Sequence, residues 1–84
     1  MSGSGFPLVQ AGDGERVEIV AVDGGPRAQR KLAHLGLAPG KTVAVVTRQP
    51  GGPLLVAVGE TRVAVGFGLA LKVKVAAAPA AALP

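Results

Sequence analysis

Apolar residues recur mostly at every second position along this chain, which is the period of a half-buried β-strand. The first such run spans residues 15–22, and its predicted inward face carries Val17, Ile19 and Ala21. Four further runs lie at residues 42–48, 54–58, 61–65 and 71–75. In the last run, Leu71, Val73 and Val75 alternate with lysines, which indicates a half-buried strand. The pattern therefore predicts five short strands, and residues 6–9 are a candidate for one more at the edge of the sheet.

Glycine and proline mark the corners between these strands. Gly59-Glu60 predicts a two-residue hairpin loop with glycine in the first place. Gly66-Phe67-Gly68 predicts a bend, with Phe67 expected in the core. Closure of such a sheet would hide strand edges that otherwise promote aggregation. We therefore expect a mainly β fold, a small barrel of about five strands with one short inserted helix.

The helical signal lies in residues 27–43, which read RAQRKLAHLGLAPGKTV. The apolar face of this predicted helix carries Ala28, Leu32 and Leu35. Gly36 follows at the place of a left-handed C-cap residue, where a glycine has no Cβ penalty. Leu37 is then expected to pack back on Leu32, as in a Schellman ending. Pro39 and Gly40 occupy the second and third places of a predicted type II turn that leads into the next strand.

Length and composition limit the chain to one small domain without a disulfide framework. The chain has 84 residues, 49% of them hydrophobic, and no cysteine. We expect residues 1–5 to form a flexible leader, residues 6–76 the folded domain, and residues 77–84 a disordered alanine–proline tail. The sequence contains no run of 18 apolar residues, so no transmembrane helix is predicted.

Positive charge gathers in the middle of the chain. The formal net charge is +4, and residues 24–59 contain basic side chains but no acidic one. Four polar side chains share the outer face of the predicted helix: Arg27, Arg30, Lys31 and His34. This face is either a solvated side of an amphipathic helix or a surface that binds a partner. Arg27 favours the second interpretation, because a positive charge in the first turn opposes the helix dipole.

Catalytic, metal-binding and nucleic-acid-binding interpretations have little support in the sequence. The serines are confined to Ser2 and Ser4, so no Ser–His–Asp set can be assembled with the single histidine. His34 has no second histidine and no nearby carboxylate, so we expect no metal site and no cofactor. Phe6 and Phe67 are the chain's aromatic residues, too few for the base-stacking surface of a typical single-strand or RNA binder.

The helix and turn also resemble a known family. Arg30-Lys31-Leu32 followed by Leu35-Gly36-Leu37-Ala38-Pro39-Gly40 is similar to the core motif of ferrous iron transport protein A (FeoA), and the flanking valine strands extend the resemblance over roughly residues 8–75. The resemblance implies an SH3-like barrel. It also implies a cytoplasmic, non-enzymatic accessory protein of ferrous iron uptake, which acts on FeoB, a membrane permease with a GTP-binding domain. The basic helix face is then the candidate contact surface.

Two alternatives to this accessory role stay open. The first is a barrel module related to the C-terminal domain of iron-dependent repressors, which shares the implied fold. The second is a basic barrel that associates with RNA, which the sequence pI of about 10.4 permits. The oligomeric state is not predicted.

Overall fold

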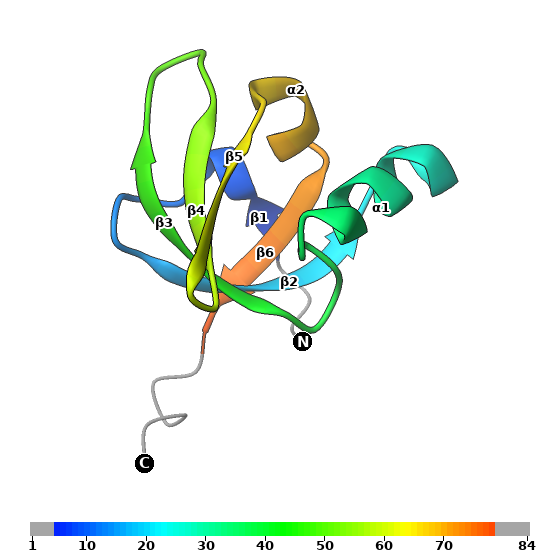
Figure 1. The fold of residues 1–84 in the computed structure, drawn as a ribbon, viewed down its shortest axis with the longest axis horizontal. Coiled ribbons are helices and arrows are strands. Elements are labelled where there is room, and N and C mark those ends of the chain that lie inside the picture. The colour runs from blue at the N-terminus through cyan, green and yellow to red at the C-terminus, as the bar shows by residue number, and fades with distance from the viewer. Residues whose placement is uncertain (1–4, 79–84) are drawn as a thin grey trace.

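The computed structural model describes residues 5–78, which contain six strands and three short helical segments (Figure 1). The strands are β1 (Phe6–Pro7), β2 (Arg16–Val22), β3 (Thr42–Arg48), β4 (Leu54–Val58), β5 (Thr61–Val65) and β6 (Val73–Ala77). The helical segments are the 3-10 turn η1 (Leu8–Gln10), α1 (Gly25–His34) and α2 (Phe67–Ala70). Most of the predicted leader and tail, residues 1–4 and 79–84, lies outside the described residues.

The strands form one antiparallel sheet with the order β1-β6-β2-β3-β4-β5. Figure 1 shows the sheet curled on itself, with α1 beside the end of β2. The mainly β fold with an inserted helix agrees with the sequence. Of the candidate strand at residues 6–9, only Phe6 and Pro7 form β1, because the chain turns into η1 at Leu8. The sequence predicts a closed barrel. Within residues 5–78, however, β5 pairs only with β4, so the sheet is not closed by hydrogen bonds. β6 runs to Ala77, the first residue of the predicted tail.

The inward faces of the strands form a core in which valine predominates. The residues with the largest fully buried side chains are Leu8, Ile19, Leu32, Leu37, Leu54, Val17, Val43, Val45, Val56, Val65, Val73 and Val75. Among the described residues, no polar or charged residue is buried. Branched Val and Ile suit such a core because they pack well on a pleated surface. Burial of this apolar surface is the main source of stability for a chain of this size.

A β-bulge in β2 overturns the alternation predicted for that strand. Ile19 pairs with Val75, but the next pair is Ala21 with Lys74, so Val20 is the extra residue. Val20 faces outward, as the alternation predicts, and is 47% exposed, whereas the bulge brings Val22 into the core at 8% exposure. The predicted inward position of Ala21 is therefore wrong, since Ala21 is only half-buried.

The segment before β6 is helical rather than a bend. The N–H of Ala70 donates to the carbonyl of Gly66 at 2.9 Å, and the N–H of Leu71 donates to that of Phe67 at 3.0 Å. This turn places Phe67 and Leu71 at the surface, 39% and 44% exposed. The expectations that Phe67 lies in the core and that Leu71 opens the last strand are both wrong. The helical turn rotates these side chains away from the alternation that continues from Val73.

Candidate functional site

Helix α1 carries the candidate site, and its C-terminus is a Schellman motif. Gly36 has a φ of +88°. The N–H of Leu37 donates to the carbonyl of Leu32 at 2.9 Å, and the N–H of Gly36 donates to that of Ala33 at 2.9 Å. Leu32 and Leu37 are both fully buried. This is the ending that the sequence predicts, with Leu35 as the half-buried C-cap residue.

The turn after α1 fastens the helix to β2. The N–H of Lys41 donates to the carbonyl of Ala38 at 3.1 Å and Gly40 has a φ of +94°, as the predicted type II turn requires. Two further bonds of 2.8 Å link this turn to Ile19, one from the N–H of Gly40 and one to the carbonyl of Lys41. Pro39, at the second place of the turn, is exposed.

Both ends of α1 pack closely on other elements. A Cβ built at Gly24 would lie 2.7 Å from the Cδ of Lys72, and a Cβ at Gly36 would lie 2.9 Å from the Cγ1 of Val58. Between the two ends, the side-chain amide of Gln29 donates to the carbonyl of Val22 at 3.2 Å. These contacts fix the direction in which each side chain of α1 points.

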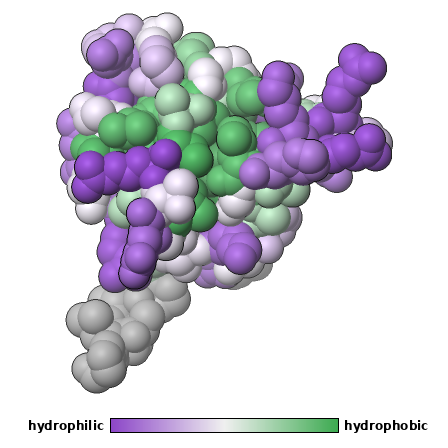
Figure 2. Space-filling model, viewed as in Figure 1, coloured by the Kyte–Doolittle hydropathy of each residue, from purple (hydrophilic) through white to green (hydrophobic). Residues whose placement is uncertain are grey.

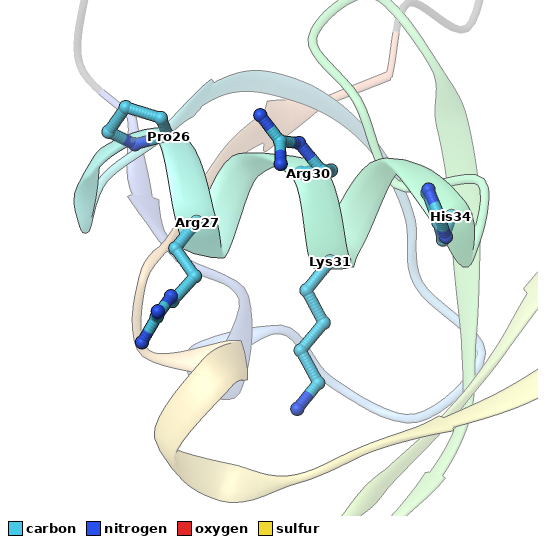
Figure 3. Close-up of a pocket in the computed structure, with 5 residues that line it drawn as sticks. All are labelled: Pro26, Arg27, Arg30, Lys31 and His34. Atoms are coloured by element: carbon cyan, nitrogen blue, oxygen red, sulfur yellow. The ribbon is translucent and has the colours of Figure 1, made fainter.

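The buried residues Ala28 and Leu32 divide the remaining surface of α1 into two flanks. The flank with Gln29 and Ala33 lies over β2, because these residues line a groove there together with Val20, Ala21, Val22, Leu37, Ala38 and Pro39. By helical periodicity, Arg27, Lys31 and Leu35 occupy the opposite flank. Figure 3 shows the Arg27 and Lys31 side chains extending in one direction from α1 and Arg30 in another.

The predicted basic face of α1 forms as a continuous, solvated surface. All four predicted residues are exposed, and they line an open hollow of about 540 Å³ together with Pro26: Arg27, Arg30, Lys31 and His34. The ion pair found among residues 5–78 joins Lys74 to Asp23 at 3.3 Å and does not involve α1. No carboxylate of the described residues therefore pairs with the basic side chains of α1. The first turn of α1, which contains Arg27, has no acidic residue. This face is therefore ready to meet negative charge on another molecule.

An apolar surface adjoins the basic face. Half-buried apolar side chains from α1, β4, β5 and α2 pack against the core: Leu35, Val58, Val63 and Leu69. Figure 2 shows apolar surface over β5 and α2, bordered by the polar side chains of α1. This surface could not be predicted from the sequence, because it depends on the exposure of the segment around α2. A broad apolar area edged by charge is typical of a protein interface.

Metal ligands do not gather on the surface of the described residues. Between residues 5 and 78, no three His, Asp or Glu side chains come together in a group that could hold a metal ion. His34 lies in the last turn of α1 beside Lys31. No helix in the described part of the chain has both the length and the apolar character needed to cross a membrane.

The molecule is a small SH3-like β domain with a capped, basic helix inserted between β2 and β3. Comparison with known proteins gives the family. The FeoA domain model matches residues 6–77. Because this match covers most of the chain, the chain belongs to the FeoA domain family, as the motif around Gly36 predicts.

Two relatives agree with this assignment. A protein of Methanocaldococcus jannaschii named "Putative Fe(2+) transport protein A" is 33% identical over 70 residues, which cover 83% of this chain and 84% of the relative. The crystal structure of an iron uptake regulatory protein (FeoA) is 40% identical, with a TM-score of 0.81, and the match covers 86% of this chain and 96% of that one.

The same SH3-like fold occurs in a larger protein. A manganese-dependent transcriptional repressor superposes with a TM-score of 0.83 at 20% identity. The match covers 93% of this chain but 44% of the repressor. At this level of identity the likeness concerns the fold alone.

Proposed function

We propose that this chain is a non-enzymatic accessory of ferrous iron uptake that acts in the cytoplasm by binding a FeoB-type membrane permease. Membership of the FeoA family and the names of its relatives supply the process. The observation that carries the binding role is the face of α1, where Arg27, Arg30 and Lys31 are exposed without an ion-pair partner among the described residues. His34 lies on the same face.

Electrostatic complementarity explains how such a face would work. Cations on a fixed helix attract an acidic surface over a distance of about a Debye length and suppress wrong partners by repulsion. The face needs no buried polar group, since its contribution is to steer and orient a partner rather than to catalyse a reaction. Iron is the cargo of the permease in this scheme, and this chain acts on the permease.

Charge reversal of α1 tests the proposal. In the variant Arg27→Glu/Lys31→Glu the apolar face of α1 is unchanged, so each substitution should alter stability by only about 0.5 kcal/mol. Like charges would then meet across the interface, and Fe(II) uptake should not be restored in cells that lack the native protein.

The matched control reverses the same amount of charge elsewhere. Arg16 and Lys41 are exposed positions outside α1. The variant Arg16→Glu/Lys41→Glu should therefore restore uptake. If the α1 variant is folded and restores uptake as well as the parent, the basic face is not the contact surface.

A second candidate function is that of a barrel module attached to a metal-dependent repressor, which the fold likeness supports. A repressor module would act through its own repressor and leave the permease untouched. Co-purification with the permease from membrane extracts would separate the two functions, since only an accessory should be recovered with it.

A further inference from the structure

Strand β5 leaves one edge of the sheet without a hydrogen-bonded neighbour. The two-residue loop Gly59-Glu60 makes Val58 and Thr61 a hydrogen-bonded pair, and such pairs alternate along an antiparallel ladder. The N–H and C=O groups of Arg62 and Ala64 therefore point away from β4. Among the described residues, these groups have no other backbone partner.

Strand β5 has few of the features that usually prevent an edge strand from pairing with another chain. The strand has five residues and no proline, and its pairing with β4 is regular, without a bulge. Arg62 is its one charged residue, and both Arg62 and Ala64 are exposed. Helix α1 packs mainly on β2, and helix α2 packs mainly on η1.

The space beside β5 is bounded by apolar side chains on one side and by cationic side chains on another. Val63, on the inward side of β5, is only half-buried, as are Val58 and Leu69. Arg27 and Lys31 lie on the flank of α1 that faces away from β2, and this flank borders the apolar surface over β5 and α2 (Figures 2 and 3). Arg62 adds a third cation from β5 itself. An extended chain laid along β5 would therefore meet apolar surface on one side and positive charge on the other.

We propose that an extended acidic segment of the partner protein, with apolar residues at alternate positions, adds to β5 as a seventh strand. Its backbone would bond to Arg62 and Ala64, its apolar side chains would cover Val63, and its carboxylates would face Arg62 and the cations of α1. Strand addition of this kind takes affinity from backbone bonds and specificity from alternate side chains. This inference rests on the proposed function, because it identifies how the permease would be held.

A second copy of this chain is a poorer occupant of the same edge. β5 has the sequence TRVAV, with one arginine and no acid, so two copies would bring like charges together. The positive net charge of +4 opposes self-association in the same way. The charge of the site thus favours an acidic segment from another protein.

The test compares Arg62→Pro with Arg62→Ala by titration calorimetry against the isolated cytosolic domain of the FeoB-type permease. Proline at residue 62 removes an outward N–H that the β4 ladder does not use, so the fold should persist, as proline is tolerated at strand edges. Alanine removes the same side chain but keeps the N–H. We expect Arg62→Pro to weaken binding by about tenfold or more, and Arg62→Ala by only about two- to threefold.

Amide hydrogen exchange on the unmodified protein keeps the proposal testable if Arg62→Pro fails to fold. The amides of Arg62 and Ala64 should become protected when the permease domain is added. Equal binding by Arg62→Pro and the parent, or binding without protection at these amides, would overturn strand addition and leave the accessory role intact. Dimerisation of this chain that Arg62→Pro abolishes would assign the edge to a second copy. Absence of any binding by the unmodified protein would refute the accessory role, and this inference with it.

Discussion

Gly36 is the residue on which the geometry of the candidate site most depends, and its substitution by alanine should be unusually costly. The residue has a φ of +88°, and a left-handed conformation costs an L residue about 1–2 kcal/mol. In addition, the new Cβ would lie 2.9 Å from the Cγ1 of Val58. Overpacking of this kind adds about 1 kcal/mol or more, because α1 or Val58 has to shift. Gly36→Ala should therefore destabilise the protein by about 2–3 kcal/mol.

Gly40 provides a matched control for the backbone contribution. Its φ is +94°, but a Cβ built there meets nothing within 4 Å. Gly40→Ala should therefore cost only about 1–2 kcal/mol. Both substitutions reduce the entropy of the unfolded chain in the same way, so that effect cancels in the comparison. The difference between the variants measures the contact of Gly36 with Val58.

Thermal unfolding followed by circular dichroism provides the measurement. A difference of 1 kcal/mol corresponds to about 4–8 °C for a domain of this size, so Gly36→Ala should melt at least that far below Gly40→Ala. Adding Val58→Ala to Gly36→Ala should recover about 1 kcal/mol relative to additivity, since it removes the clashing methyl group. If the two glycine variants melt at the same temperature, α1 does not approach β4 as closely as described.

Two further predictions concern β2 and β3. Val22→Thr should destabilise the protein by about 1–3 kcal/mol because it buries a hydroxyl. Val20→Thr at the exposed bulge should change stability by no more than about 0.5 kcal/mol. Denaturant titration measures both variants, and a larger loss of stability for Val20→Thr than for Val22→Thr would contradict the bulge. The guanidinium of Arg48 donates to the carbonyl of Val9 at 2.6 Å. Arg48→Ala should therefore cost about 0.5–1.5 kcal/mol while Arg48→Lys costs less, and equal melting temperatures for parent and Arg48→Ala would show that this bond contributes nothing.

Features governed by neighbours in the sequence could be predicted from it. The Schellman ending at Gly36 and the turn at Gly40 follow from the conformational freedom of glycine, and the Gly59-Glu60 hairpin follows from loop length. The mainly β class follows from the alternation of valines. These features involve only a few consecutive residues, so the physical information needed to predict them is present in the local sequence.

Features governed by pairing between distant residues could not be predicted. The bulge at Val20 depends on how β2 meets β6, and alternation within β2 alone placed Ala21 inward. The exposure of Phe67 depends on the helical turn α2, which contains Gly68 although glycine is a weak helix former. The open edge at β5 depends on the strand order of the whole sheet.

The candidate site shows the same division between local and long-range information. Helical spacing correctly brought Arg27, Arg30, Lys31 and His34 to one exposed face. The apolar surface beside that face and the outward backbone groups of Arg62 and Ala64 emerge only from the assembled sheet. No local pattern around Arg62 distinguishes an edge strand from a central one, since both alternate in the same way.

We propose that the basic face of α1 contacts the FeoB-type permease. A nuclear magnetic resonance titration of the labelled protein with the permease's cytosolic domain, at low and at high salt, tests this contact directly. Amide shifts should change along α1 at Arg27, Arg30, Lys31 and His34, and affinity should fall as salt rises, because screening weakens attraction between exposed charges. Shift changes confined to β2 and β3, or an affinity independent of salt, would contradict it.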